Sequence, residues 1–554
     1  MSTEPALHYA YKWEKQRPND IWFVQPMNDG QIREITFKAA MDEARRMAAH
    51  LKSLNFPEKS NIALFSKNSA WWIMADLAIW MAGHVSVPLF PTLAADTIKQ
   101  ILDHSESKLI FVGKLDGFEA MKPGIPDDLP AISLPLSPQT PYQSWQQIVD
   151  KTEPLTEDVK RDPEEMATIV YTSGSTGKPK GVMLGFGPMA HCVSAVQELI
   201  TIDKNDRVLS YLPLAHVFER FLVETSTLIF GVKVYFAQSL DTFVNDLNRA
   251  RPTVFASVPR LWLKFQLGVF QKMSPNVLRV LLRLPVIRGI ISKKVLGGLG
   301  LDQVRYAISG SAPIPAELIA WYRKLGLELL EAYGMSENFC YSHCNRPGDV
   351  KVGTVGAPQD NVQCRISEQG EILVKSPGSM MGYYKEPELT KNAFTDDGFL
   401  KTGDRGKIDN RGRLRITGRV KELFKTSKGK YVAPAPIENK ILRSNIIEMA
   451  CVSGSGQPAP YAMIVLSESA RAEAKDSSKR NGLAQQLDSY RKEINSQLDH
   501  HEHLKMMVVI AEEWTIENGK LTPTMKLKRN AIETAYEKNV DGWYKANQAV
   551  VWQD

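Results

Sequence analysis

The chain of 554 residues has few cysteines, a small net charge and no long uninterrupted hydrophobic run. Its five cysteines form an odd set without C-x-x-C spacing, which excludes a disulfide scaffold, argues against structural zinc and favours a reducing compartment. The excess of 68 Lys and Arg over 62 Asp and Glu is too small to indicate a nucleic-acid partner, and no nucleic-acid-binding motif accompanies it. Because the N-terminus lacks the apolar core of a secretory signal, we expect a cytoplasmic protein.

The most apolar segment, residues 70–89, is too interrupted to cross a bilayer. Asp76 and His84 lie within it, and Pro88 would end any helix. A transmembrane helix needs about 20 nearly uninterrupted apolar residues. We therefore expect a buried helix that leads into a strand, and no membrane-crossing segment.

Short apolar runs typical of strands alternate with amphipathic helical patterns along roughly the first 350 residues. Strands that alternate with helices predict a largely parallel, doubly wound α/β sheet. The length allows three or four domains of about 150 residues each, or one large lobe with a smaller companion. The predicted strands are 61–65, 109–112, 168–171, 208–212, 232–236, 253–257 and 304–309, and the predicted helices include 37–54, 94–104 and 316–325.

From about residue 351 the sequence becomes richer in Gly and Pro, and segments 370–375 and 413–417 are typical of antiparallel strands. We therefore expect a β-barrel-like subdomain at the end of a large N-terminal lobe, followed by a small α+β domain. We place the division between residues 1–418 and residues 419–554. The elements predicted in the second part are a helix near residue 436, a strand at 462–466, a charged helix at 469–500 and a strand at 506–511.

The most informative segment is 171–181, YTSGSTGKPKG, which follows an apolar strand and contains three glycines and four Ser or Thr residues. Glycines allow close backbone approach, and N–H groups and short hydroxyls bind phosphate oxygens, so the segment predicts a phosphate-binding loop. It differs from a Walker A loop, because Gly174 lies too close to Gly177 and Pro179 replaces the Ser or Thr. The alternative is a flexible Ser/Gly loop, which does not account for two lysines and a proline in fixed order.

This loop resembles, nearly residue for residue, the signature loop of the adenylate-forming superfamily, which includes acyl-CoA synthetases, nonribosomal-peptide adenylation domains and luciferases. Six further motifs follow in the family's order, and the resemblance extends from about Phe37 to a lysine motif near the C-terminus. It implies that ATP binds here and that Thr176 also takes part in catalysis. The loop residues implied to bind the nucleotide are Thr172, Ser173, Gly174, Ser175, Thr176, Gly177, Lys178 and Lys180.

Residues 211–220, YLPLAHVFER, resemble the segment at the entrance of the acyl pocket, in the form found in long-chain acyl-CoA synthetases. The resemblance implies that His216 positions the substrate carboxylate or shapes the acyl tunnel. The alternative for a lone histidine beside apolar residues is a hydrogen-bonded core residue. Some bacterial relatives have a gating tryptophan four residues after this histidine, where this chain has Arg220.

Two further motifs are implied to hold adenosine and a metal ion. SGSAP, at 309–313, resembles the turn that contacts adenine, although small residues and proline are also typical of a helix N-cap. In the motif EAYGMSE, the resemblance implies that Tyr333 stacks on adenine, that Ser336 contacts the α-phosphate and that Glu337 binds Mg²⁺. Magnesium prefers such oxygen ligands. The other residues implied to line the nucleotide are Gly310, Ser311, Ala312, Gly334 and Met335.

The motifs GFLKTGD and GRVKELFKTSKGKYVAP, which contain Asp404 and Arg419, resemble the family's ribose-binding and hinge motifs. Asp404 is implied to accept both ribose hydroxyls, and Arg419 to reach the ribose or phosphate. Lys421 matches the hinge about which a mobile C-terminal domain turns, and the loop near Gly429 is implied to face the site during thioester formation. Alternatively, an isolated T-G-D is a surface turn and a basic run is a solvated loop.

Residues 521–529, LTPTMKLKR, resemble the family's C-terminal catalytic-lysine motif. Lys526 is implied to bridge the substrate carboxylate and the α-phosphate, and Lys528 is its chief alternative. Met525 occupies the position where many relatives have glycine.

The residues of these motifs are most similar to those of long-chain fatty acyl-CoA synthetases, which implies a ligase that uses ATP, Mg²⁺ and CoA. Such an enzyme converts a fatty acid to acyl-AMP and then to acyl-CoA, releasing pyrophosphate and AMP. One alternative is an acyl-AMP ligase that passes the acyl group to a carrier protein or another acceptor. Another is a degenerate lipid-binding member of the family, which would be expected to have lost Glu337, Asp404, Arg419 or Lys526.

Residues 277–301 combine Leu, Val and Ile with five basic residues. This pattern is typical of a segment that lies on an anionic membrane surface, so it predicts peripheral contact with the inner face of the cell membrane. The alternative is a core helix with solvated basic edges, since Pro285 and several glycines interrupt the helical pattern. The expected partners are therefore fatty acid, ATP and CoA, with no nucleic acid and an undetermined oligomeric state.

Overall fold

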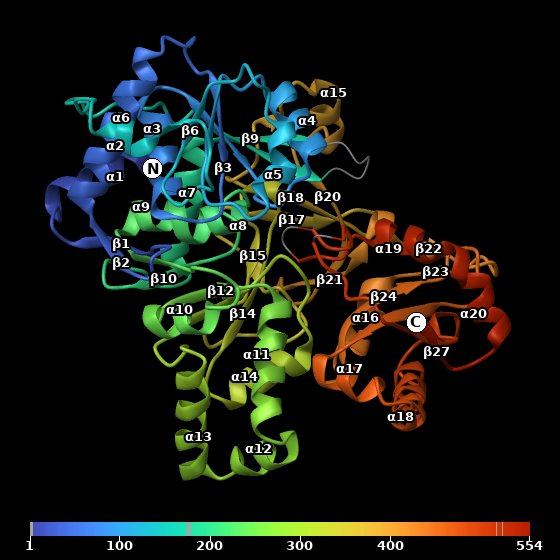
Figure 1. Ribbon diagram of the computed structural model, residues 1–554. Helices are drawn as coiled ribbons and strands as arrows, with labels where there is room; N and C mark the ends of the chain where they lie inside the picture. The colour runs from blue at the N-terminus through green and yellow to red at the C-terminus, as the bar shows by residue number, and fades with distance from the viewer. Residues whose placement is uncertain (1–3, 174–178, 517, 523–524, 554) are drawn as a thin grey trace.

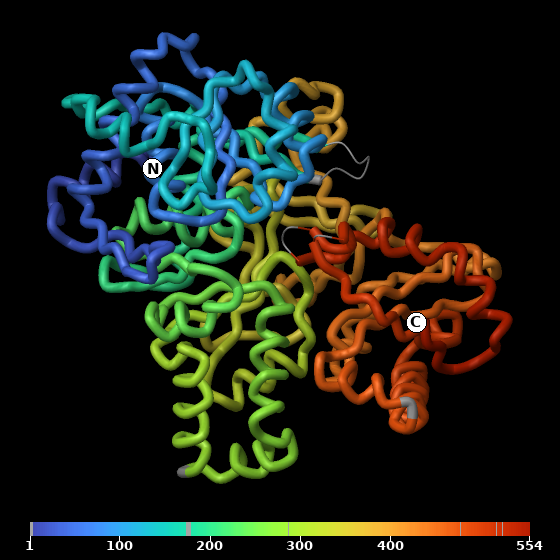
Figure 2. Tube along the Cα trace, in the orientation of Figure 1, coloured from blue at the N-terminus to red at the C-terminus, as the bar shows by residue number. Residues whose placement is uncertain are grey.

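The computed structural model describes residues 4–173, 179–516, 518–522 and 525–553. They form a large N-terminal lobe with a smaller C-terminal domain beside it (Figure 1). The chain passes from the lobe into this domain only after most of its length, as the orange to red part of the trace shows (Figure 2). Within the described residues, no helix has the length and apolar character that a membrane span requires.

The largest sheet in the described residues has eight strands in the order β19-β9-β8-β4-β3-β5-β6-β7. The strands β8, β4, β3, β5, β6 and β7 are parallel to one another. Beyond β8, the strands β9 and β19 extend the sheet by antiparallel pairing. The strands are β3 (Asn61–Phe65), β4 (Val85–Leu89), β5 (Leu109–Val112), β6 (Ala131–Ser133), β7 (Gln143–Ser144), β8 (Met166–Ser173), β9 (Pro179–Gly185) and β19 (Gly382–Tyr383).

Helix α3 (Ala70–Met81) is buried at every position and packs beside α2 (Phe37–Ser53). The Ser69 side chain caps α3 by accepting a hydrogen bond from the Trp72 amide at 3.2 Å. Since β4 begins a few residues after α3 ends, the predicted buried helix that leads into a strand is confirmed. Shorter helices of this part are α4 (Ala95–Ser105), α5 (Phe118–Met121) and α6 (Trp145–Val149).

Two smaller sheets complete the α/β part of the lobe. One has the order β10-β11-β1-β2, and the other has the order β12-β13-β14-β15-β16. Their strands are β1 (Ile21–Pro26), β2 (Ile32–Thr36), β10 (Arg207–Ser210), β11 (Lys233–Phe236), β12 (Val254–Ser257), β13 (Tyr306–Ser309), β14 (Leu329–Tyr333), β15 (His343–Cys344) and β16 (Ala357–Pro358). The accompanying helices are α10 (Phe243–Ala250), α11 (Pro259–Lys272), α12 (Pro275–Leu281), α13 (Pro285–Gly298) and α14 (Ala316–Lys324), of which α12 and α13 project from the lobe (Figure 1).

A helical segment that starts at His216 runs without a break through α8 (Val217–Glu219), η3 (Arg220–Thr225) and α9 (Ser226–Phe230), beside α7 (Phe186–Ala195). Its central part, η3, is a π-helix, a rare form that is frequently found at functional sites. The segment ends at Gly231, where φ is +67°. Helix α1 (Ala6–Gln16) holds this end, because the Trp13 indole donates to the Leu228 carbonyl at 2.7 Å and Arg17 donates to the Gly231 carbonyl at 2.9 Å.

The β-rich part of the lobe is an antiparallel sheet in the order β17-β18-β20-β21. Its strands are β17 (Gln363–Ile366), β18 (Glu371–Lys375), β20 (Leu400–Ile408) and β21 (Leu414–Arg419), and α15 (Pro387–Ala393) precedes β20. Asp404 of β20 is paired directly with Arg419 of β21. The sheet register therefore brings together two residues of separate predicted motifs.

The C-terminal domain is built on the sheet β24-β25-β26-β27 and has hydrophobic clusters of its own. The predicted charged helix at 469–500 is two helices, because the Asp476 side chain accepts from the Ser478 amide and starts a new helix there. The predicted division at residue 418 falls at the end of β21 and stays a prediction. The elements are β22 (Phe424–Lys425), β23 (Tyr431–Val432), α16 (Pro434–Ile441), β24 (Ile447–Ser453), β25 (Tyr461–Leu466), α17 (Glu468–Ala474), α18 (Ser477–Asn495), β26 (Met507–Ile510), α19 (Arg529–Tyr536), α20 (Val540–Ala546) and β27 (Val550–Gln553).

Candidate active site

Asp404 is held from both sides by residues of two other predicted motifs. The Tyr333 hydroxyl donates to its Oδ2 at 2.7 Å, and Arg419 Nε donates to its Oδ1 at 2.9 Å. Burial and the nearby carboxylate raise the pKa of Tyr333 well above its usual value, so the phenol remains a donor. Each carboxylate oxygen still has a lone pair, which leaves Asp404 able to accept two hydroxyl groups.

The turn after β14 approaches its own chain very closely at Gly334. A Cβ atom at this glycine would lie 2.4 Å from the Cys340 backbone, so no side chain fits there. The buried Asn338 stabilises the turn, because its Oδ1 accepts from the Met335 amide at 2.9 Å. Phe339 and Cys340 have φ values of +48° and +58°, a left-handed conformation that costs free energy in residues other than glycine and is typical of functional sites. Ser336 is buried in this turn.

Glu337 is half-buried in the same turn, and its Oε1 accepts a hydrogen bond of 2.8 Å from Tyr383. The Tyr383 ring in turn lies 5.5 Å from the Lys180 ammonium, measured to the ring centroid. Tyr383 therefore links the phosphate-loop hairpin to the predicted metal ligand. Sequence analysis missed Tyr383, because it lies in the short strand β19 and no motif marks it.

The loop predicted to bind phosphate lies between β8 and β9, which pair as an antiparallel hairpin. Thr172 is opposite Lys180 in this hairpin. The predicted residues Gly174, Ser175, Thr176, Gly177 and Lys178, together with the Ser173 side chain, lie outside the described residues. The predicted contacts of this loop with phosphate therefore stay a prediction.

Lys526 lies in a short loop of the C-terminal domain, closed by hydrogen bonds between its backbone and Thr522. Desolvation and the positive charge of Arg419 lower the pKa of Lys526, and the charges of Cys340, Asp404 and Glu337 act in the opposite direction. Cys340, Asp404 and Glu337 belong to the N-terminal lobe, so groups of the lobe act on a lysine of the C-terminal domain. Lys526 and Lys528 are both exposed residues, and the Lys528 amide donates to the Lys520 carbonyl at 2.9 Å.

Met525, directly before this lysine, has a φ of +63°. This left-handed conformation is the one that glycine adopts without strain. It explains why glycine is common at this position in the family that the motif resembles.

His216 precedes α8, and its Nδ1 accepts a hydrogen bond of 3.1 Å from the Phe218 amide. Burial, and next the charge of Lys526, lower the pKa of His216 to about 3, so the ring is neutral at physiological pH. Because Nδ1 is an acceptor, the ring proton is assigned to Nε2. His216 thus offers a neutral hydrogen-bond donor close to Lys526.

The turn predicted to contact adenine follows β13. The Gly310 amide donates to the Ser257 carbonyl at 3.2 Å, and a Cβ atom at Gly310 would lie 3.1 Å from the Phe218 ring. Ser311 has a φ of +69°, and Ala312 is exposed. The N-cap position of α14 is occupied by Pro315, and no side chain makes a cap hydrogen bond there, so the turn is not the helix cap considered as an alternative.

Lys421 and Gly429 lie between the end of β21 and the start of β23. Lys421 is exposed in η5 (Val420–Glu422), which joins β21 to the β22–β23 hairpin. Gly429 forms the turn of this hairpin with a φ of +76°, and its amide donates to the Thr426 carbonyl at 2.9 Å. The charged groups with the largest effect on the pKa of Lys526 do not lie on this hairpin.

Arg220, at the position of a gating tryptophan in some relatives, is fully buried in the core. Its Nη2 lies 2.6 Å from Asp76 Oδ2, and the ring of Trp72 lies 5.3 Å from its guanidinium carbon. Glu224 Oε2 lies 3.0 Å from Nε, outside hydrogen-bonding geometry, and burial raises the pKa of this carboxyl well above its usual range. Arg220 is thus a member of a buried charge cluster.

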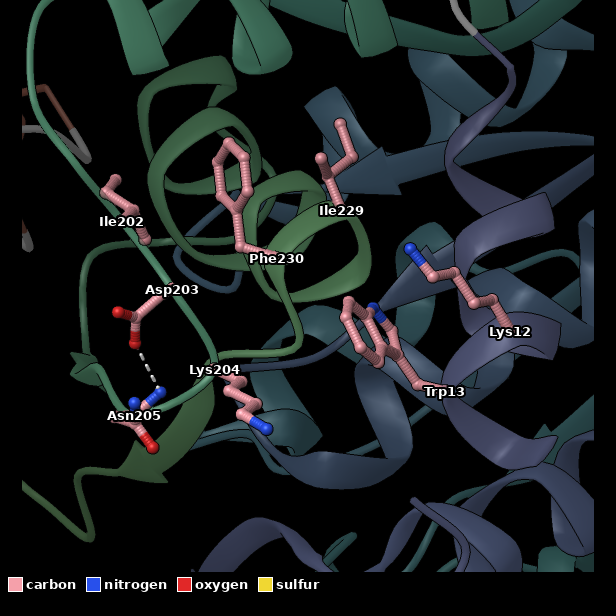
Figure 3. Close-up of a pocket in the computed structure, with 8 residues that line it drawn as sticks. All are labelled: Lys12, Trp13, Ile202, Asp203, Lys204, Asn205, Ile229 and Phe230. Atoms are coloured by element: carbon pink, nitrogen blue, oxygen red, sulfur yellow. Dashed lines mark hydrogen bonds between the residues drawn. The ribbon is translucent and has the colours of Figure 1, made fainter. Parts of the chain in front are cut away.

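A surface cavity of about 370 Å³ lies at the far end of the helical segment that starts at His216. Figure 3 shows Lys12 and Trp13 of α1 across from Ile229 and Phe230 of α9. The residues that line it include none of the predicted site residues.

Two family models match this chain. One, described as AMP-binding enzyme, matches residues 11–384, and the other, described as AMP-binding enzyme C-terminal domain, matches residues 422–548. The two matches agree with the observed lobe and the smaller domain after it.

Curated relatives match along most of their length. The long-chain-fatty-acid–CoA ligase FadD15 of Mycobacterium bovis is 29% identical to this chain over 591 aligned residues, which cover 97% of this chain and 96% of that protein. The long-chain-fatty-acid–CoA ligase 1 of Homo sapiens is 31% identical, with 87% of this chain and 78% of that protein covered.

Among solved structures, the anthranilate CoA ligase AuaEII in complex with anthranoyl-AMP has a TM-score of 0.79 at 20% identity, with 98% of this chain and 99% of that chain covered. The fold prediction of a large α/β lobe followed by a small domain is thereby confirmed.

Proposed function

The chain belongs to the AMP-binding enzyme family, and from this premise we propose that it is an acid–thiol ligase that joins a long-chain fatty acid to CoA. ATP first converts the fatty acid to acyl-AMP with release of pyrophosphate, and the CoA thiol then replaces AMP. The observation that supports the proposal is that Lys526, in the C-terminal domain, is within electrostatic reach of Arg419, Asp404 and Glu337.

Adenylation brings negative charges together, because a carboxylate attacks the α-phosphate of ATP. No protein nucleophile is needed, so catalysis consists of positioning and charge stabilisation. We assign the Lys526 ammonium to the space between the carboxylate and the α-phosphate, and the His216 Nε2–H to the carboxylate. Loss of one such preorganised group costs about 10²–10³ in rate.

The nucleotide is held by groups that the fold orients in advance. Asp404 accepts the ribose hydroxyls, Tyr333 offers its ring to adenine, and Arg419 reaches the ribose or a phosphate. The turn at Gly310 borders the adenine, and the loop between Thr172 and Lys180 binds the β- and γ-phosphates. Because Tyr333 and Arg419 already orient the Asp404 carboxylate, little reorganisation is required when ATP binds.

Glu337 fits a magnesium ion, which typically binds one or two protein carboxylates together with substrate phosphates and water. Its carboxylate is half-buried and is oriented by Tyr383 through Oε1. When bound, the ion supplies positive charge to the triphosphate. The part played by Glu337 itself is to present a carboxylate oxygen in a fixed place on the phosphate-loop side of the site.

For the second step we propose that the C-terminal domain turns about Lys421 as a mobile domain. The present arrangement, with Lys526 at the site, serves adenylation. Rotation would remove this lysine and bring the loop at Gly429 to the site for thioester formation. Such a change also keeps the reactive adenylate away from water.

Transfer to a carrier protein or another acceptor would use the same first step, so the acceptor must be tested directly. A degenerate, lipid-binding role fits less well. Tyr333 and Arg419 orient Asp404 with two hydrogen bonds, an arrangement that an inactive pocket would not need.

The deciding experiment measures pyrophosphate release with acids from acetate to oleate, with and without CoA. We expect sustained turnover with long-chain acids only when CoA is present. Accumulation of unchanged acyl-AMP in the presence of CoA would contradict the CoA assignment. Absence of pyrophosphate release with every acid would contradict the ligase assignment itself.

We further propose that the projecting helices α12 and α13 contact an anionic membrane surface. Between Asp246 and Asp302 the chain has ten Lys and Arg residues and no acidic residue. Val277, Val280 and Ile290 are between 52% and 64% exposed, although they are aliphatic. Exposed aliphatic side chains among cations are typical of a surface that binds anionic lipid, where free fatty acid would also be concentrated.

Sedimentation with vesicles tests this surface. We expect binding to vesicles with anionic lipid and little binding to neutral vesicles, with loss of binding at high salt. The variant Arg279→Glu/Arg283→Glu should lose binding, whereas Lys475→Glu/Lys479→Glu, with the same charge change on the other domain, should retain it. Equal binding by both variants would contradict the proposal.

A further inference from the structure

The loop that leads from β10 to His216 is held by a buried side chain from a distant part of the chain. Asn68 lies between β3 and α3 and is 6% exposed. Its Nδ2 donates to the Leu212 carbonyl at 2.6 Å, and its Oδ1 accepts from the Leu214 amide at 3.0 Å. One carboxamide therefore binds the loop backbone on both sides of Pro213.

This loop needs such a partner because it is buried and lies between regular elements. Residues 211–216 connect β10 to α8, and Leu214 and Ala215 are buried. Buried backbone N–H and C=O groups are costly to leave without a hydrogen bond. The Asn68 carboxamide supplies one donor and one acceptor to this backbone, so the conformation of the loop depends on it.

Glu219, in α8, anchors the start of the same loop. Its Oε1 accepts from the Tyr211 amide and from the Ser210 hydroxyl, both at 2.9 Å. The Ser210 oxygen in turn accepts from Asn68 Nδ2 at 2.8 Å. The side chains of Asn68, Ser210 and Glu219 form one network, which ties the beginning of the loop to the helix that follows it.

This network carries little charge at neutral pH. Glu219 is 3% exposed, and burial raises the pKa of its carboxyl to about 8, against the opposing effect of its hydrogen bonds with Ser210 and Tyr211. A protonated carboxyl still presents a carbonyl oxygen as an acceptor. A glutamine would present the same acceptor, which makes Glu219→Gln a conservative substitution.

His216 lies at the end of the loop and is fixed by it. Its amide donates to the Pro213 carbonyl at 2.8 Å, and its carbonyl accepts from the Glu219 amide at 3.1 Å. Because Nδ1 accepts from the Phe218 amide at 3.1 Å, the ring has a fixed direction relative to this backbone. A displacement of the loop would therefore also displace the Nε2–H donor.

We propose that Asn68 and Glu219 are positioning residues that hold the His216 Nε2–H where it meets the substrate carboxylate. The proposal rests on the proposed ligase function and deepens it. Hydrogen bonds weaken steeply as their geometry departs from the optimum, and misplacement of a reacting group by about 1 Å can cost about 10²-fold in rate. Asn68 and Glu219 are themselves buried, so their influence on the reaction passes through the loop.

The test is a double-mutant cycle on the full-length enzyme, measured by ATP–pyrophosphate exchange with a long-chain fatty acid. Asn68→Ala should lower kcat/KM for the fatty acid about 10–100-fold and leave the KM for ATP unchanged. In the His216→Ala background, the same substitution should lower kcat/KM about twofold or less, because the imidazole that Asn68 positions is already absent.

Two substitutions at Glu219 separate positioning from folding. Glu219→Gln keeps the acceptor and should retain most of the activity. Glu219→Leu removes the acceptor and should match Asn68→Ala, again only when His216 is present. Melting temperatures, recorded for every variant, show whether the compared proteins are folded.

The matched control is Asn345→Ala. Asn345 is 1% exposed in the same lobe and holds another loop, because its Nδ2 donates to the Thr354 carbonyl at 2.7 Å and its Oδ1 accepts from the Lys351 amide at 3.2 Å. Its substitution should change kcat/KM by the same factor in the wild-type and His216→Ala backgrounds.

Equal losses from Asn68→Ala in the two backgrounds would overturn the proposal, because they would show an effect that does not involve the imidazole. A loss from Glu219→Gln as large as that from Glu219→Leu would overturn the role of the Glu219 acceptor. If Asn68→Ala fails to fold, the cycle at Glu219 decides. In contrast, absence of exchange in the wild-type protein would count against the ligase function itself.

Discussion

The Tyr333 hydroxyl donates a hydrogen bond of 2.7 Å to Asp404 Oδ2, although 71 residues separate the two along the chain. Asp404 is buried, so it depends on its donors for orientation. We expect Tyr333→Phe, which keeps the ring but removes the donor, to raise the KM for ATP about tenfold with little effect on kcat, since a hydrogen bond to a charged group contributes about 1.5–3 kcal/mol. Steady-state kinetics with varied ATP checks this.

A matched control for that variant is Tyr322→Phe. Tyr322 is also buried in the lobe, and its hydroxyl donates to the Trp262 carbonyl at 2.7 Å. Its removal should lower the melting temperature and leave the KM for ATP unchanged. Equal effects of the two substitutions on this KM would mean that the Tyr333 hydroxyl acts only on stability.

Lys526→Ala should abolish adenylation and largely spare thioester formation from supplied acyl-AMP. The reason is that the lysine charge is needed only where negative charge gathers around phosphorus, at a cost of about 10²–10³ when it is lost. Single-turnover assays of the two half-reactions measure this. A similar loss in both would contradict the assignment of Lys526 to the first step alone.

The pH dependence of adenylation follows from the environment of Lys526. Desolvation and Arg419 lower the pKa of its ammonium, so the charge is lost at a lower pH than in a free lysine. We therefore expect kcat/KM for adenylation, which reports the free enzyme, to decline on the alkaline side below the ordinary lysine pKa of about 10.4. Lys526→Arg should move this decline to higher pH, and an unmoved decline would assign it to another group.

Among the residues that the structure describes, two ion pairs connect the domains: Arg260 with Glu448 at 3.2 Å, and Glu317 with Arg443 at 3.1 Å. Both are partly exposed, so each contributes about 0.2–1 kcal/mol. Glu317→Gln/Glu448→Gln should weaken this arrangement and raise the rate of thioester formation relative to adenylation a few-fold. Glu513→Gln, which removes a partner of Arg471 within the C-terminal domain, is the control. An unchanged ratio in the double variant would refute the role of these pairs.

The buried cluster of Asp76, Arg220 and Glu224 predicts unequal effects of two similar substitutions. Burial raises the pKa of Glu224, so this carboxyl is neutral and Asp76 is the ionic partner of Arg220. Asp76→Asn should destabilise the protein by about 3–5 kcal/mol, because it leaves a buried charge unpaired. Glu224→Gln should cost about 1 kcal/mol or less. Urea unfolding measures both, and equal costs would contradict a neutral Glu224.

The same cluster predicts a pH dependence of stability. The folded protein keeps the Glu224 proton to higher pH than the unfolded chain does, so this group's contribution to stability is complete below the unfolded pKa of about 4.3 and is lost as pH rises. Between this pH and the higher pKa of Glu224 in the folded protein, the free energy of unfolding falls by about 1.4 kcal/mol per pH unit. Glu224→Gln should remove this part of the slope, and an unaltered slope would mean that the carboxyl is ionised in the folded state.

The sequence predicted a strand correctly where a short apolar run alone was enough to indicate it. The strands expected at 61–65 and 109–112 coincide with β3 and β5, because a short apolar run bounded by polar residues is compatible with few structures other than a buried strand. The prediction of a single charged helix at 469–500 was wrong, because the structure has two helices there. Asp476 caps a new helix by accepting from the Ser478 amide, a local hydrogen bond that periodicity does not register.

The site could be predicted only in part, because its contacts join distant residues. Motifs placed Glu337 and Asp404 in the site, but nothing local marks Tyr383, which is 46 residues from Glu337 and donates to it. Arg220 shows the opposite case. Its position in a motif pointed to the acyl tunnel, whereas its contacts with Asp76 and Trp72 place it in the core.

The helical segment from His216 to Gly231 connects the proposed site to helix α1 near the start of the chain. Helix α1 holds the far end of this segment through Trp13 and Arg17, and the near end carries the imidazole beside Lys526. Shortening or loosening the N-terminus would therefore free one end of a helical segment whose other end carries the histidine that we propose for binding the carboxylate. We expect such a change to impair the positioning of the substrate carboxylate more than the binding of ATP, although the altered residues are remote from the proposed site.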